Sequence, residues 1–226
     1  MSYKAVIFDL VGTLVDERYG AYAAMLERVA GLLGVSIETF TRANAADARA
    51  RNVGEYESVA HQFDAQCREL AISPSPERLA EAIGAYTDLQ RTRLVPRDGV
   101  LETLDRLGRL GLKRGLISNC PQVFVDLWPE TELSAHLDDA VLSAQVKLVK
   151  PDPAIYRLAC QRLGVEPGEC LYVGDGGADE LTGAAAVGMH AVLIRVPYAD
   201  ETVLGTGRQE WNGAIVKSIP EVLGLV

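Results

Sequence analysis

The chain has 226 residues, of which 48% are hydrophobic and 23% are charged, and its formal net charge is −9. This composition is ordinary for a globular protein and excludes a disordered or repetitive chain. The negative charge argues against a nucleic-acid or anionic membrane partner, and no apolar run approaches the ~20 residues of a membrane span. We therefore expect a cytoplasmic protein with no signal peptide.

The first predicted element is a buried strand over residues 5–8, because this short apolar run contains β-branched residues and stops abruptly at Asp9. In an open α/β sheet, ligands sit outside the carboxyl ends of the strands. Asp9 at such an end is a candidate nucleophile. The alternative is that Asp9 only caps the turn that precedes Gly12.

Residues 16–94 have a helical pattern and almost no strand signals. Apolar residues recur at three-and-four spacing between Tyr22 and Leu33, which is typical of an amphipathic helix. We expect further helices over residues 37–49, 53–70 and 75–93. A helical block of this size between two strands predicts an inserted subdomain over residues 16–96, with a core domain built from residues 1–15 and 97–226.

Strands and helices alternate in the rest of the chain. The expected strands cover residues 114–119, 140–143, 170–175, 191–196 and 214–216, and the expected helices cover residues 100–110, 153–163, 180–187 and 220–225. This alternation predicts right-handed crossovers and a parallel sheet with helices on both faces. The fold class is therefore α/β, with a Rossmann-like parallel core and an inserted helical bundle.

Polar side chains of distinct kinds follow four of the predicted strands, and parallel strands deliver their ends to one edge of a sheet. These side chains are Asp9 with Thr13, Ser118 with Asn119, Lys150, and Asp175 with Asp179 and Glu180. Together they suit phosphoryl transfer. An aspartate can attack phosphorus, a hydroxyl and a lysine can hold the phosphoryl oxygens, and further carboxylates can hold Mg²⁺.

Four segments in this order resemble the motifs of the haloacid dehalogenase (HAD) superfamily of hydrolases. They are residues 8–16, which resemble DxDGTLxD, and residues 116–119, 150–156 and 173–180. One such segment alone is a weak signal, whereas four ordered segments on strand ends are a strong one. The resemblance covers the length of the chain and implies a Mg²⁺-dependent phosphatase acting on a small phosphorylated molecule.

The resemblance also implies a role for each matching residue. Asp9 would form an aspartyl-phosphate and contact the metal, Ser118 and Lys150 would orient the phosphoryl group, and Thr13 and Asn119 would bind substrate. Asp175 would be a metal ligand, together with the backbone carbonyl of Val11. The second acid of this motif would be Asp179 or Glu180, and we favour Asp179, which leaves Glu180 as a charge in the first turn of a helix.

The inserted helices resemble the helical cap that this superfamily carries in its first insertion position. Residues 16–18 and 94–99 would then be the hinges on which the cap closes over the substrate and excludes water.

Val11 departs from the family pattern, because phosphatases and phosphomutases carry an aspartate there that protonates the leaving group and activates water. Loss of a general acid and base typically reduces the rate 10²- to 10⁴-fold. We therefore expect weak activity on poor leaving groups and better activity on acyl or aryl phosphates. The valine backbone carbonyl remains available to the metal.

Two alternatives stay open. One is a dehalogenase or other C–X hydrolase that uses Asp9 on carbon, which the acids Asp175 and Asp179 weaken. The other is a non-catalytic protein that binds a phosphate ligand or a partner. A phosphonatase is disfavoured, because that reaction uses a cap lysine and residues 16–94 contain no lysine.

Several reactive side chains match no motif. The cysteines have no metal-binding or redox spacing and are expected to be buried, with Cys120 nearest the site. The arginines of the helical block are expected on a solvated helix face. The cysteines, histidines and arginines that match no motif are Cys67, Cys120, Cys160, Cys170, His61, His136, His190, Arg42, Arg49 and Arg51.

Overall fold

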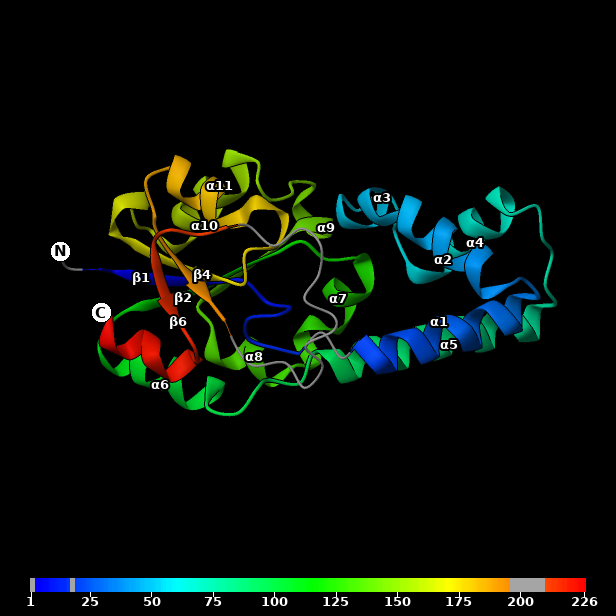
Figure 1. The fold of residues 1–226 in the computed structure, drawn as a ribbon, viewed down its shortest axis with the longest axis horizontal. Coiled ribbons are helices and arrows are strands. Elements are labelled where there is room, and N and C mark those ends of the chain that lie inside the picture. Colours follow the sequence, from blue (N-terminus) through cyan, green and yellow to red (C-terminus); the bar gives the residue numbers. More distant parts are fainter. Residues whose placement is uncertain (1–2, 17–18, 196–209) are drawn as a thin grey trace.

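The computed structural model describes residues 3–16, 19–195 and 210–226, and it contains a six-stranded parallel sheet in the order β3-β2-β1-β4-β5-β6 (Figure 1). The strands are β1 (Ala5–Phe8), β2 (Lys113–Ser118), β3 (Asp139–Leu142), β4 (Cys170–Gly174), β5 (His190–Ile194) and β6 (Ala214–Val216). This sheet confirms the predicted α/β fold class.

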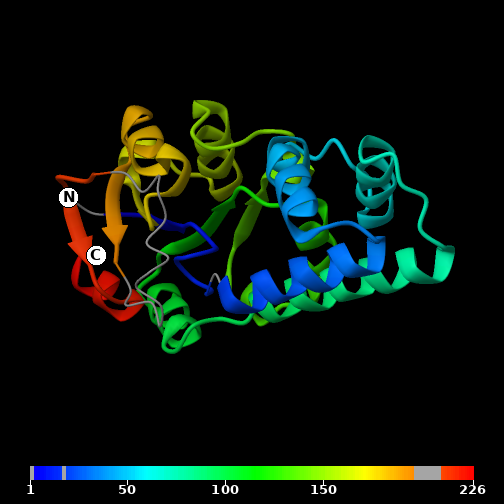
Figure 2. The same cartoon turned by 45° about the vertical axis from the view of Figure 1, so that its right-hand side comes forward.

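Helices cover both faces of the sheet (Figures 1 and 2). Helices α10 (Pro153–Leu163) and α11 (Glu180–Ala186) pack on one face, where Ala5 and Ile7 of β1 join their core cluster. On the other face, Val6 and Phe8 belong to a second cluster that includes α6 (Val100–Arg109). The alternation of side chains along a strand explains why β1 serves both cores and is buried throughout.

Strand β1 lies between β2 and β4, which aligns three carboxyl ends at one edge. Phe8 is paired with Leu116 of β2 and with Val173 of β4. The residues that follow these strands therefore start from neighbouring positions at that edge, and they include Asp9 and Asp175. The architecture thus positions the predicted site through strand order.

A block of five helices lies beyond this edge, between β1 and α6 in the chain (Figures 1 and 2). The long helices α1 and α5 run side by side, with the other three beside them. The helices are α1 (Tyr19–Leu33), α2 (Ile37–Ala46), α3 (Ala48–Asn52), α4 (Val59–Glu69) and α5 (Pro76–Arg93). The block matches the predicted inserted helices, and its status as a separate domain stays a prediction.

Serine side chains define where three of these helices begin. Ser36, Ser58 and Ser75 are the N-caps of α2, α4 and α5, and each hydroxyl accepts a hydrogen bond from a backbone N–H of the first turn. Such a cap satisfies a donor that has no partner within the helix. The cap at Ser58 corrects the prediction of a helix that starts at residue 53.

The single helix predicted over residues 37–49 is also wrong, since the chain breaks at Asp47 into α2 and α3. The Asp47 side chain is buried and accepts hydrogen bonds from Tyr56 and Gln66, so tertiary contacts hold the break. Other boundaries match the prediction or differ from it by one or two residues, and the helix expected over residues 220–225 is a 3-10 helix, Ile219–Gly224. Residues 17–18 of the predicted first hinge, and Val196 of a predicted strand, lie outside the described residues.

Shorter helices connect the remaining elements: α7 (Gln122–Leu127), α8 (Glu132–His136) and α9 (Ser143–Val146), with 3-10 turns at η1 (Trp128–Glu130), η2 (Pro167–Glu169), η3 (Gly177–Asp179) and η5 (Ile219–Gly224). All four cysteines are buried, as predicted. Within the described ranges no single helix has the length and apolarity of a membrane span, although the bent pair Gly20–Leu33 and Ile37–Ala46 passes that test when joined.

Candidate active site

Asp9 is the first residue after β1, and the sheet fixes its position. Its backbone N–H donates to the Val173 carbonyl of β4 over 2.9 Å, and the residue is 6% exposed. Gly12 follows with a φ of 86°, a left-handed conformation that suits glycine and turns the chain back. The carboxylate is therefore held on a rigid strand end.

Lys150 joins Asp9 to Glu180. Its Nζ lies 2.5 Å from Oδ1 of Asp9 and 2.5 Å from Oε2 of Glu180, and all three side chains are buried. Burial lowers the pKa of an amine, but the two carboxylates outweigh it and raise the pKa of Lys150 well above its usual value. These carboxylates therefore favour the ammonium form of Lys150.

The side-chain amide of Asn119 holds the backbone of Lys150 from both sides. Its Nδ2 donates to the Lys150 carbonyl over 3.1 Å, and its Oδ1 accepts from the Lys150 N–H over 2.8 Å. Asn119 was predicted to bind substrate. In this structure its amide is engaged with the lysine segment, so it positions Lys150.

The carboxylate of Glu180 is fully enclosed. Its oxygens accept from the Tyr172 hydroxyl over 2.8 Å and from the Gly176 N–H over 3.0 Å. Burial and the neighbouring Asp9 charge raise the pKa of Glu180 to about 7, while Lys150 opposes this shift. A bound cation would favour the ionised form of such a carboxyl group.

The preference for Asp179 as the second acid disagrees with the geometry. Asp179 is exposed and has a left-handed φ of 51°, whereas Glu180 is 1% exposed and begins α11. Side chains in the first turn of a helix tilt towards its N-terminus, so Glu180 reaches back to the strand end. Gly174 leaves space for the Glu180 carboxylate, because a Cβ at position 174 would lie 2.2 Å from Oε1 of Glu180.

Three acids are close enough to share a cation. Ligand oxygens of Asp9, Asp175 and Glu180 lie within 4.8 Å of one another, and all three residues are buried. An all-oxygen donor set of this kind is the type that Mg²⁺ prefers. The residues present therefore fit the predicted metal.

Two polar atoms in this region are buried and have no hydrogen-bond partner among the residues that the structure describes. They are Oδ2 of Asp9 and Oγ1 of Thr13. Buried polar atoms are normally paired, so an unpaired set at a strand end indicates atoms kept for a ligand. Ser118, 1% exposed, ends the neighbouring strand β2. Val11 is half-buried, and its side chain can neither give nor accept a proton.

Tyr172 and Tyr156 are site residues that the sequence reasoning missed. The Tyr172 hydroxyl lies 3.4 Å from Nζ of Lys150 in addition to its bond with Glu180, and the Tyr156 hydroxyl donates to the Glu180 carbonyl over 3.0 Å. The two rings pack edge to face. A signal was available for Tyr172, which is the one hydroxyl in the apolar run of β4.

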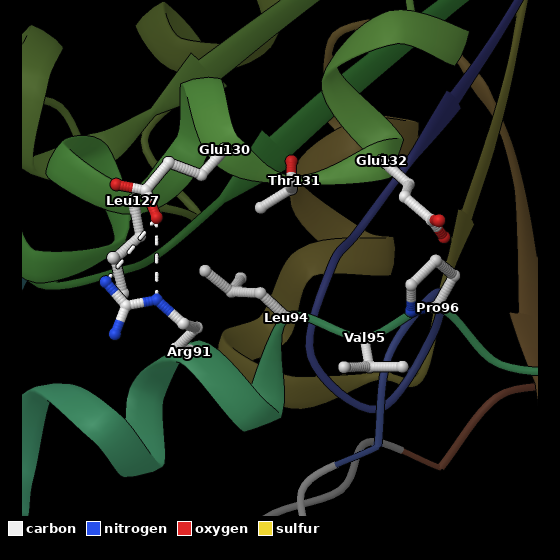
Figure 3. Close-up of a pocket in the computed structure, with 8 residues that line it drawn as sticks. All are labelled: Arg91, Leu94, Val95, Pro96, Leu127, Glu130, Thr131 and Glu132. Atoms are coloured by element: carbon white, nitrogen blue, oxygen red, sulfur yellow. Dashed lines mark hydrogen bonds and ion pairs between the residues drawn. The ribbon is translucent and has the colours of Figure 1, made fainter.

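A pocket of about 320 Å³ lies elsewhere, beside the chain segment that leaves the helical block (Figure 3). One side is lined by Arg91 and residues 94–96 and the other by Leu127 and residues 130–132, and an ion pair between Arg91 and Glu130 crosses the pocket. None of the predicted site residues lines this pocket, so it is separate from the carboxylate cluster.

Comparison with known proteins gives a consistent result. The family model of haloacid dehalogenase-like hydrolases matches residues 3–188. The glyceraldehyde 3-phosphate phosphatase of Methanopyrus kandleri is 30% identical over 197 residues, which cover 85% of this chain and 84% of that protein.

Solved structures share the fold over nearly the whole chain. A HAD phosphatase from Thermococcus onnurineus has a TM-score of 0.66 at 24% identity, with 98% of this chain and 97% of that chain covered. The L-2-haloacid dehalogenase of Xanthobacter autotrophicus has a TM-score of 0.65 at 22% identity, with 99% and 98% covered. At these identities the likeness describes the fold only, and it includes proteins of both reaction types.

Proposed function

Since this chain belongs to the haloacid dehalogenase-like hydrolases, we propose that it is a Mg²⁺-dependent phosphatase of small phosphorylated metabolites that works through an aspartyl-phosphate at Asp9. The named phosphatase from Methanopyrus kandleri, similar over most of both chains, supports the phosphate-ester class of substrate.

One observation carries the proposal: Asp9 has one oxygen held by Lys150 and one left without a partner among the described residues. Oδ1 lies 2.5 Å from the ammonium group, while Oδ2 is buried and unpaired. A carboxylate fixed in this way presents a single oriented nucleophilic atom. The positive charge of Lys150 beside it can attract an anionic phosphoryl group.

The proposed reaction has two steps. Oδ2 of Asp9 attacks phosphorus, an O–P bond forms, and the bond from phosphorus to the leaving oxygen breaks with its electron pair on that oxygen. Water then attacks phosphorus, the bond from phosphorus to Oδ2 breaks with its electron pair on Oδ2, and the carboxylate is restored. The proton that water loses passes to the released phosphate or to bulk water. Lys150, Ser118 and Thr13 would hold the phosphoryl oxygens during both steps, since their side chains supply donors near the end of β1.

Asp9, Asp175 and Glu180 would hold the magnesium ion, with the Val11 carbonyl as a further candidate ligand. When bound, Mg²⁺ supplies positive charge that screens the repulsion between the carboxylate and an anionic substrate. Tyr172 would keep Glu180 in position, because its hydroxyl donates to the carboxylate from a buried ring.

Val11 limits the range of good substrates. The leaving oxygen receives no proton from this position, so a group that is stable as an anion should leave fastest. Acyl phosphates meet that requirement, because their leaving group is a carboxylate. Simple alkyl phosphates should be slow.

We expect metal-dependent release of phosphate from acetyl phosphate. Removal of Mg²⁺ with EDTA should reduce the steady-state rate by at least about 100-fold, because several kcal/mol of charge stabilisation are lost, and added Mg²⁺ should restore it. Ca²⁺ at the same concentration is the matched control, because a cation that only stabilised the fold could be replaced by Ca²⁺ without loss of activity. Chloride release from 2-chloropropionate without phosphate release would replace the proposal with a C–X hydrolase, and phosphate binding without turnover would make the protein a binding module.

The choice between the two candidate acids can be tested directly. Glu180→Gln should weaken activation by Mg²⁺ by about 100-fold or more, whereas Asp179→Asn, an exposed change one residue away, should alter it less than about threefold. The measurement is the Mg²⁺ concentration that gives half-maximal phosphate release, with direct Mg²⁺ binding by calorimetry as a second readout. The reverse order of effects would restore Asp179 as the metal ligand.

A further inference from the structure

Among the three arginines expected on a solvated helix face, Arg51 is the one whose side chain is largely enclosed. Arg42 and Arg49 are exposed, but the Arg51 side chain is only 10% exposed. Burying a guanidinium is unfavourable unless hydrogen bonds and opposite charge compensate it. The environment of Arg51 therefore differs from a solvated helix face and must compensate the charge of the guanidinium.

A polar network inside the helical block fixes this side chain by one nitrogen. Nη1 of Arg51 donates to the backbone oxygen of Asn44 over 2.7 Å and to its Oδ1 over 2.6 Å, and it lies 3.5 Å from Oδ2 of Asp47. Asp47 in turn accepts from Tyr56 and from Gln66, and Asn44 donates to Tyr22. The guanidinium plane is thus oriented by buried partners.

The opposite edge of the guanidinium is not used. Nε and Nη2 of Arg51 make no hydrogen bond with any residue that the structure describes, and neither atom is sealed from solvent. These two nitrogens form the side-on fork of arginine, which matches the two oxygens of a carboxylate or of another oxyanion. Because Nη1 fixes the guanidinium while Nε and Nη2 keep their donors free of described partners, this fork is preorganised to bind an anion.

Arg51 also lies where the helical block meets the catalytic edge. Its neighbour Asn52 accepts a hydrogen bond from Ser143 Oγ over 2.6 Å, and Ser143 Oγ accepts from the Cys120 N–H over 2.9 Å. Cys120 follows Asn119, whose amide holds Lys150. A short chain of contacts therefore joins the arginine's helix to the candidate phosphate site.

A second cation borders the same region. The guanidinium of Arg93 stacks over the Tyr22 ring at 5.2 Å and over the Phe124 ring of α7 at 5.7 Å. The Tyr22 hydroxyl accepts the hydrogen bond from Asn44 Nδ2, so the contacts of Arg51 and those of Arg93 meet at Asn44 and Tyr22.

We propose that Arg51 is a specificity-determining residue that binds a second oxyanion group, such as a carboxylate, on the phosphorylated substrate. This inference rests on the proposed phosphatase function and narrows its substrate class to phosphorylated acids. Asp47, Asn44 and Tyr22 act as positioning residues for the fork. Two observations support this inference: Nε and Nη2 of Arg51 have no hydrogen bond to a described residue, and hydrogen bonds through Ser143 connect the helix of Arg51 to the segment of Asn119.

The test compares two ligands that differ only at the distal group: 3-phosphoglycerate, with a carboxylate, and glycerol 3-phosphate, with a hydroxymethyl group. We expect the native protein with Mg²⁺ to bind the first about tenfold or more tightly than the second in calorimetry, and the same order in inhibition of acetyl phosphate hydrolysis. Arg51→Gln should remove most of that preference, because it weakens the binding of 3-phosphoglycerate by about 10-fold or more, as expected for loss of a charged hydrogen-bonded pair, and leaves the binding of glycerol 3-phosphate nearly unchanged.

Matched controls separate recognition from folding. Arg49→Gln changes an exposed arginine on the same helix and should retain the preference. Arg51→Lys keeps the charge but loses the fork and should give an intermediate preference, which covers the case in which the glutamine variant does not fold. The inference would be overturned if the native protein bound both ligands equally, or if Arg51→Gln lost affinity for both equally. In either case, turnover of acetyl phosphate would leave the phosphatase proposal intact. Absence of binding and of turnover would overturn both.

Discussion

Asp9→Asn should reduce Mg²⁺-dependent release of phosphate from acetyl phosphate by about 10⁴-fold or more. The amide is nearly the same size as the carboxylate but is a poor nucleophile, so the covalent step is lost while the strand end keeps its shape. Lys150 retains Glu180 as a partner at 2.5 Å, which protects the buried ammonium from being left unpaired.

The measurement is steady-state phosphate release with and without Mg²⁺, beside native protein and Asp88→Asn, the same substitution at an exposed position. Thermal unfolding of each variant checks that the fold is retained. Rapid-quench trapping of a labelled phosphoprotein should succeed with the native chain and fail with Asp9→Asn. Turnover of the variant within tenfold of native would remove Asp9 from the role of nucleophile.

Val11→Asp should raise the hydrolysis of alkyl phosphates by about 10²- to 10⁴-fold and should change acetyl phosphate turnover much less. The new carboxyl group would stand two residues after Asp9, where a general acid can protonate an alkoxide leaving group and a general base can then activate water. An acyl leaving group needs no such proton, so the gain depends on the substrate.

The pair of substrates is the internal control for this prediction, and Val11→Asn, similar in size but unable to transfer the proton, is the matched variant. The rates of phosphate release from glycerol 3-phosphate and acetyl phosphate are compared for all three proteins. A selective gain with aspartate alone would indicate that the rest of the phosphatase machinery is competent. No gain on either substrate would favour the carbon-centre reaction or the binding function.

Local patterns were sufficient for most of the fold. The apolar run before Asp9 predicted β1 at its observed bounds, and the alternation after residue 99 predicted the parallel sheet. These patterns succeed because a strand buried on both faces must be apolar and a crossover helix must present one apolar stripe. The break at Asp47 escaped prediction because its cause, the contacts to Tyr56 and Gln66, lies up to 19 residues away in the chain.

The sequence by itself determined the kind of chemistry and where along the chain it resides: an acid at the end of β1, a lysine before Pro151, and further acids after β4. Which of these side chains meet was decided by the tertiary structure. The left-handed turn before α11 turns Glu180 inward and leaves Asp179 exposed. Contacts with Asn44 and Asp47 enclose most of the Arg51 side chain and leave Nε and Nη2 without a hydrogen bond to any described residue. The reason is physical: a residue type states what a side chain can do, whereas its direction, burial and partners depend on backbone turns and long-range packing that no local pattern contains.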